Sequence, residues 1–131
     1  MTPKQILDIK IRAALAMGWT QVNTWDEANV LPDDTFYVSE HNVVAPVGYD
    51  LWEPDSDLNH AMMLAVKLYG NFDHHDKYID LNLDDTGCAA TIRYGEGFYD
   101  FAIAENNNPA LALTLAVLKA LEEIKRCSGD Q

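Results

Sequence analysis

The segment NNPALALTLAVL, residues 107–118, determines how the rest of this chain must be organised. Its last nine residues contain one polar side chain, that of Thr114. Asn108 is a favourable N-cap, Pro109 suits the first helical position, and residues 125–129 carry the basic side chains and the glycine that are typical of a helix C-terminus. A helix that is apolar on nearly all sides has to be covered by other elements. The sequence therefore predicts a long buried helix with the remaining chain packed around it.

Two shorter helices are predicted ahead of it. Thr2-Pro3-Lys4-Gln5 has the pattern of a capping box with proline in the first turn, and Gly18 can provide the left-handed residue that ends the helix. A second helix is expected to begin with Asp55 or Ser56 as its cap and to run to Gly70.

Three strands are predicted at Ile79–Leu83, Cys88–Tyr94 and Phe98–Ala104. The turns between them have hairpin length, so we expect an antiparallel meander. The third strand carries apolar residues on both sides, which favours helices on both faces of the sheet.

The segment 19–56 is rich in aromatic residues and prolines and lacks a regular period, so we expect an irregular insertion. Thr35–Ser39 and Asn42–Ala45 are candidate short strands that could pair through Glu40-His41. The fold class expected for residues 1–131 is a single α+β domain. It would be a three-layer α/β/α sandwich with three helices and an antiparallel meander of three to five strands.

Several short motifs match one known family. They are Met17-Gly18-Trp19 at the end of the first helix, residues 52–57 at the entry to the second, Pro109-Ala110-Leu111-Ala112, and residues 118–121. Together they resemble the phage ABA sandwich domain, a small α/β/α family of phage and prophage genomes. The resemblance implies a fold and a phage context, and it brings no catalytic motif with it.

Charge is distributed unevenly along the chain. The net charge is −12, and residues 26–105 hold 17 acidic side chains against three basic ones. This surface would repel nucleic acid, which proteins bind by neutralising phosphates with Lys and Arg. It is compatible with a basic protein partner or with solubility alone.

The candidate metal ligands are sparse. Asp73-His74-His75-Asp76 combines suitable side chains, but adjacent residues rarely point at one ion, so we interpret the segment as a surface linker. Asp84, Asp85 and Thr86 are interpreted as a turn because the calcium-loop pattern of an EF-hand is absent. We expect no metal and no cofactor, and Cys88 and Cys127 to be free thiols.

Enzymatic activity has the least support. Asp80 and Asp100 could flank a cleft as a carboxylate pair, but exposed strand acids give the same pattern. The sequence contains no nucleophile elbow and no phosphate-binding loop. We therefore expect a non-enzymatic protein that acts by binding.

Two binding hypotheses follow. In the first, the aromatic segment forms a pocket for a small, nucleotide-like host signalling molecule. Its residues would be Trp25, Tyr37, Tyr49, Trp52 and Arg93. In the second, the chain is an acidic inhibitor that mimics nucleic acid and docks on a basic host defence nuclease. That interface would use Asp33, Asp34, Asp55 and Asp57.

The expected location is the cytoplasm of a bacterial host. The N-terminus carries a helix start in place of a secretory signal, and no apolar run is long enough to span a bilayer. A homo-oligomer is a further hypothesis, because exposed aromatic side chains often lie in interfaces.

Overall fold

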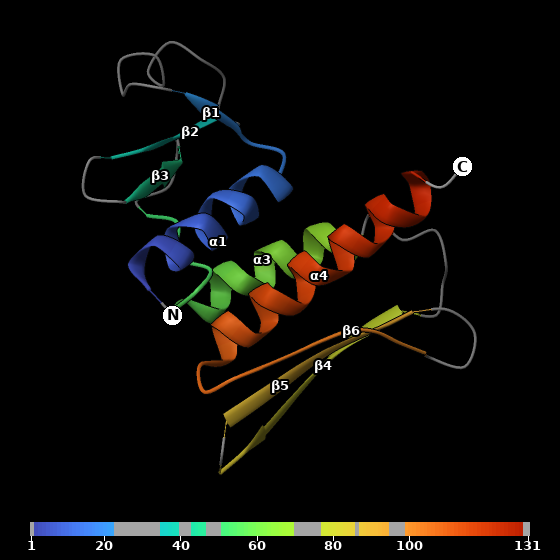
Figure 1. Cartoon of the computed structure of the whole chain (residues 1–131). Helices are drawn as coiled ribbons and strands as arrows, with labels where there is room; N and C mark the ends of the chain where they lie inside the picture. Colours follow the sequence, from blue (N-terminus) through green and yellow to red (C-terminus); the bar gives the residue numbers. More distant parts are fainter. Residues whose placement is uncertain are drawn as a thin grey trace. The chain divides into compact units, whose positions relative to one another are not determined.

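The structure is a computed structural model of the 131-residue chain. The residues it describes are 2–22, 35–39, 43–46, 51–69, 77–85, 87–94 and 99–129. These residues form three α-helices and two three-stranded sheets, so the fold is α+β (Figure 1). The chain divides into two compact units, Met1–Glu53 and Pro54–Gln131. None of the described helices is both long and apolar enough to cross a membrane.

Helix α1 (Pro3–Ala16) begins as its sequence predicts. The Gln5 N–H donates to Thr2 Oγ1 at 3.2 Å, and the Thr2 N–H donates back to Gln5 Oε1 at 2.8 Å. This reciprocal pair is the predicted capping box, and it satisfies two N–H groups that have no partner inside the helix.

The same helix ends in a Schellman motif. Gly18 has a φ of +90°, its N–H donates to Leu15 O at 3.0 Å, and the next N–H, of Trp19, reaches Ala14 O at 3.3 Å. Glycine adopts this left-handed conformation without the steric cost of a Cβ, which confirms the predicted helix end.

Three short strands follow in the first unit: β1 (Thr20–Val22), β2 (Thr35–Val38) and β3 (Val44–Pro46). Strands β2 and β3 are antiparallel, as predicted for this pair of segments. Strand β1 pairs parallel to β2, and the sequence did not predict it. The expectation of irregular structure across 19–56 is therefore wrong for these residues, because three residues are too few to show a strand period.

The second unit contains α3 (Leu58–Tyr69), β4 (Lys77–Asp84), β5 (Gly87–Tyr94), β6 (Tyr99–Asn106) and α4 (Pro109–Gly129). The strands lie in the order β4-β5-β6, and each is antiparallel to its neighbour. Helix α4 contacts all three strands, and α3 packs against α4.

The two faces of this sheet differ. On one face Ala90, Ile92, Ala102 and Ala104 are buried. On the other face the described side chains include the exposed residues Asp80, Asn82, Ile103 and Glu105. A helical layer over this second face stays a prediction.

The buried start of α4 is explained by its contacts. Residues 110–114 are all buried, and the hydroxyl of Thr114, the polar exception, donates to Pro54 O at 2.7 Å. Asn108 is the predicted N-cap, since its Oδ1 accepts from the Ala110 N–H at 2.9 Å.

The cap of α3 lies one residue beyond the predicted positions. The Asn59 N–H donates to Asp57 Oδ1 at 2.9 Å, so Asp57 is the N-cap and Leu58 begins the helix. Asp55 and Ser56 instead belong to a turn whose carbonyl groups bond to α4, Asp55 through Asn108 Nδ2 at 2.9 Å.

Candidate functional site

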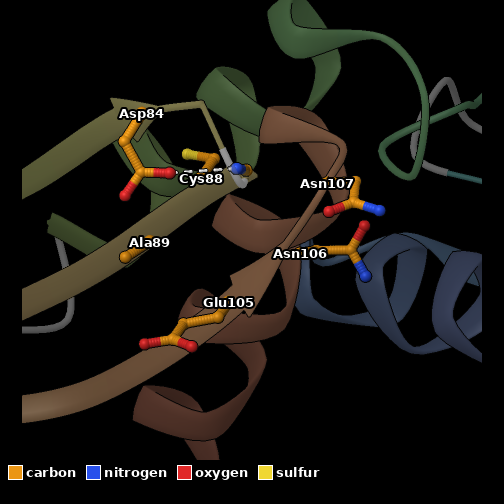
Figure 2. Close-up of a pocket in the computed structure, with 7 residues that line it drawn as sticks. Asp84, Cys88, Ala89, Glu105, Asn106 and Asn107 are labelled. Carbon is orange, nitrogen blue, oxygen red and sulfur yellow. Dashed lines mark hydrogen bonds between the residues drawn. The ribbon is translucent and has the colours of Figure 1, made fainter.

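A hollow of about 320 Å³ lies at the end of the sheet in the second unit (Figure 2). The turn between β4 and β5 forms one side of it, and the connection from β6 to α4 forms the other. The lining residues are Asp84, Gly87, Cys88, Ala89, Glu105, Asn106 and Asn107.

The first side is a tight turn closed by a carboxylate. The Gly87 N–H donates to Asp84 Oδ1 at 3.1 Å, the bond drawn in Figure 2. Gly87 has a φ of +146°, and a Cβ at this position would lie 3.0 Å from Asn106 O and 3.1 Å from Asn107 Oδ1. Glycine is therefore required both by the backbone conformation and by the close approach of the neighbouring connection.

The second side is a run of three asparagines that ends the strand and begins the helix. Asn106 Oδ1 accepts from the Asn108 N–H at 3.0 Å, and Asn108 then caps α4. Short polar side chains that bond to nearby backbone favour such turns and caps. In Figure 2, Glu105 points away from Asn106 and Asn107, as expected for alternation along a strand.

The charge of this hollow limits its ligands. Asp84 and Glu105 provide two carboxylates, and both residues are exposed. A phosphate group would be repelled, whereas amines, guanidinium groups and other hydrogen-bond donors would be attracted. Asp84 Oδ1 and Asn106 Oδ1 each accept a backbone N–H within their own turn, so much of this polar lining has a structural role.

Cys88 is the lining residue with nucleophilic chemistry. Burial, and then the nearby charge of Asp84, raises the pKa of its thiol above the ordinary value of 9.0. The side chain is 4% exposed. A protonated, buried thiol is a weak nucleophile, because the thiolate is the reactive form.

The outer face of the sheet gathers acidic side chains beside an apolar one. Register places Asn82, Ala89 and Glu105 in one row across the three strands, with Asp80 and Asp84 on the same face of β4. We call Asp80, Asp84, Asp85 and Glu105, all exposed, the acidic face. Ile103, which is 43% exposed, lies on the same face in the row of Asp80 and Thr91.

Of the four aromatic residues predicted to form a pocket, the structure describes Tyr37 and Trp52. Trp52 is 1% exposed, and its ring lies edge-on to that of Trp19 with 4.8 Å between centroids. The backbone N–H of Trp52 donates to Val44 O at 3.0 Å. The structure thus gives this ring a place in the core, where a stacking ligand could reach it only after rearrangement.

Two of the other predicted ligand residues are described by the structure. Tyr37 on β2 and Arg93 on β5 are partly exposed and belong to different compact units. Trp25 and Tyr49 lie outside the described residues, so their role stays a prediction.

The predicted acidic partner residues show a similar division. Asp57 caps α3 and lies 3.7 Å from His60 Nε2, so it has a structural role. Asp55 is partly exposed in the turn before it, while Asp33 and Asp34 lie outside the described residues. The four residues of the acidic face are all exposed, whereas Asp55 and Asp57 are only partly exposed. None of the four was among the residues predicted for partner binding.

Metal binding finds no support among the residues that the structure describes, where no three metal-type side chains gather. The segment 73–76, with His74 and His75, is not among those residues, and neither is Thr86. Asp84 closes the predicted turn through its bond to Gly87.

Comparison with known proteins gives no identification, because no family model, curated protein or solved structure matches the chain. The resemblance to the phage ABA sandwich domain therefore stays a prediction, and function has to be argued from the geometry.

Proposed function

We propose that this chain is a non-enzymatic phage or prophage accessory protein that binds a basic host protein in the bacterial cytoplasm. In this proposal its fold is a three-layer α/β/α sandwich of the phage ABA type, with an antiparallel meander. A basic host defence nuclease, whose nucleic-acid surface the chain would mimic, is the kind of target that fits.

One observation carries the proposal: the exposed acidic face on β4, its turn and β6. Its four carboxylates are exposed, and the exposed side chain of Ile103 lies on the same face of the sheet, in the same row as Asp80. Mixed surfaces of this kind, with an apolar residue and a charged surround, are typical of protein interaction sites. A net charge of −12 would also steer a basic partner towards it.

The alternative proposal is that the chain sequesters a small nucleotide-like signal in an aromatic pocket. It has weaker support, because Trp52, one of the four aromatic residues predicted to line that pocket, is 1% exposed and packs against Trp19. Native mass spectrometry after incubation with a bacterial small-molecule extract tests it. A retained compound would establish the pocket, and the measured mass would also show whether the chain forms a homo-oligomer.

Affinity capture from host lysate, followed by affinity measurement on the purified partner, tests the main proposal. The wild type should retain a basic protein whose dissociation constant rises at least tenfold between 50 and 300 mM NaCl, roughly as expected for screened surface charges. The double variant Asp80→Lys/Glu105→Lys should lose this partner.

The matched control is Asp8→Lys/Glu122→Lys, which changes the net charge equally through exposed helix residues outside the acidic face. Folding of both variants is checked by circular dichroism. If both double variants weaken binding to the same extent, net charge alone is responsible and the acidic face is not the interface.

A further inference from the structure

The two edges of the β4-β5-β6 sheet are not equivalent. On the β6 edge, Lys119 of α4 donates from Nζ to Ile103 O at 2.9 Å. Lysine at a sheet edge is a common means of preventing a further strand from pairing there. The edge formed by β4 has exposed side chains at Asp80, Asn82, Leu83 and Asp84.

The register shows which backbone groups of β4 face outward. Residues of antiparallel strands alternate between bonding to one neighbour and facing the other side. Because Lys119 reaches the carbonyl of Ile103, we place that carbonyl on the outer side of β6. Thr91, its partner on β5, therefore bonds to β4, and the adjacent Ala90 bonds to β6.

Leu81 is the β4 partner of Ala90, so its N–H and C=O point away from the sheet. The same holds two residues along, at Ile79 and Leu83. The two-residue turn between Asp84 and Gly87 gives the same assignment. The residues that flank such a turn bond to each other, so Asp84 bonds to β5 and Leu83, next to it, faces outward. Strand β4 therefore offers a row of outward backbone groups.

The side chains along this edge define what would pair with it. Asp80, Asn82 and Asp84 lie on the outer face, while Leu81 and Leu83 lie on the face towards α4. Leu83 is 66% exposed, so an added strand could cover it. A strand with basic residues on one side and apolar residues on the other would complement both faces.

We infer that the β4 edge binds an extended segment of a partner protein in which Lys or Arg alternates with apolar residues. The segment adds as a fourth strand next to Lys77–Asp84. A second copy of β4 is a poor occupant, because it would bring acidic side chains together. This inference rests on the proposed function, since it specifies how the acidic chain engages its basic partner.

The test uses two end-blocked eight-residue peptides, one alternating Lys and Val and the other alternating Glu and Val. Binding to the full chain is measured by calorimetry at 50 mM NaCl, and amide exchange is followed by NMR. The Lys peptide should bind and the Glu peptide should not. Binding should slow exchange of the Leu81 and Leu83 amides at least tenfold, but change that of Asn82, which already bonds to β5, much less.

Variants separate backbone pairing from charge attraction. Leu81→Pro removes an outward N–H, as proline is tolerated on the open side of an edge strand, and should weaken binding of the Lys peptide at least tenfold. Leu81→Val keeps the N–H and should bind as the wild type does. Urea unfolding of both variants checks that the sheet is intact.

The outcomes distinguish the inference from the proposed function. Binding that is lost in Asp80→Lys/Asn82→Lys but unchanged in Leu81→Pro, without amide protection, overturns strand addition and leaves an acidic docking surface. Failure of the Lys peptide to bind also overturns strand addition, whereas the proposed function is decided by the captured host protein. Salt-sensitive binding together with protection of Leu81 and Leu83 supports both.

Discussion

Thr114 and Pro54 are separated by sixty positions along the chain, yet the Thr114 hydroxyl donates to the Pro54 carbonyl at 2.7 Å within the core. This bond explains how a helix start that is otherwise apolar tolerates one polar side chain. It also fixes the turn that precedes α3 against α4. The bond is therefore a link between two helices as well as a satisfied polar group.

Replacing Thr114 by Val keeps the shape of the side chain but removes its hydroxyl, which leaves the Pro54 carbonyl buried without this donor. We expect the free energy of unfolding to fall by about 1–3 kcal/mol. Urea unfolding at 25 °C measures it. Thr91→Val makes the same atomic change on the partly exposed strand β5 and should alter stability by less than about 0.5 kcal/mol. Equal effects at the two positions would show that the Pro54 bond contributes nothing special.

Asn108 makes a second link to the same turn. Its Oδ1 caps Ala110 and its Nδ2 donates to Asp55 O, each at 2.9 Å. Asn108→Ala removes both bonds and should cost about 1–2 kcal/mol in urea unfolding. Asn108→Asp keeps the cap oxygen and loses only the donor, so its free energy of unfolding should lie between those of Asn108→Ala and the wild type. Because Asn108 and Thr114 hold one turn, the double variant Asn108→Ala/Thr114→Val should be less destabilised than the two single effects added together.

Sequence patterns predicted the helices and the β4-β5-β6 sheet because a hydrophobic period extends over many residues in each element and local residues mark its ends. The Thr2 capping box, the Gly18 helix end and the Asn108 cap depend on residues within a few positions of one another, and all three are confirmed. The three β4-β5-β6 strands were also predicted, each within two residues at either end.

What could not be predicted depends on contacts between distant residues. Strand β1 has three residues and pairs with β2, which begins thirteen positions after it ends, so no local period identifies it. The hollow combines a turn at Gly87 with a connection at Asn106, and the predicted third strand ends at Ala104, two residues before β6 does. The consecutive asparagines 106–108 were the signal that the strand continues to a polar turn and cap.

Gly87 should be the least replaceable glycine among those that the structure describes. Gly87→Ala combines a φ of +146° with contacts of 3.0 and 3.1 Å to Asn106 O and Asn107 Oδ1. Gly18→Ala has a φ of +90° but no neighbour within 4 Å, so only backbone strain of about 1–2 kcal/mol is expected. Thermal unfolding of the two variants should show Gly87→Ala to be the less stable by at least about 1 kcal/mol. The reverse order would mean that the β6–α4 connection moves aside easily.

The Cys88 thiol should make stability depend on alkaline pH. Its folded pKa is raised above 9.0 by burial and by Asp84, so the folded chain keeps the proton where the unfolded chain has lost it. This contribution to stability is fully present below pH 9.0 and is lost as the pH rises through the raised folded pKa. Urea midpoints of Cys127→Ser and Cys127→Ser/Cys88→Ala are compared at pH 7.5 and 10. The variant that keeps Cys88 should lose more stability, and parallel losses would contradict a raised thiol pKa.

Lys119 should protect the β6 edge more than it stabilises the fold. Its bond to Ile103 O is exposed, so Lys119→Met should change the free energy of unfolding by less than about 0.5 kcal/mol. Without the ammonium group, the outer backbone of β6 becomes available for pairing, and self-association should increase. Sedimentation velocity at rising protein concentration measures this change. Lys67→Met on α3 makes the same chemical change away from the sheet, and it should remain like the wild type. If the two variants associate equally, the cause is the changed surface charge or hydrophobicity, and the Ile103 bond has no protective role.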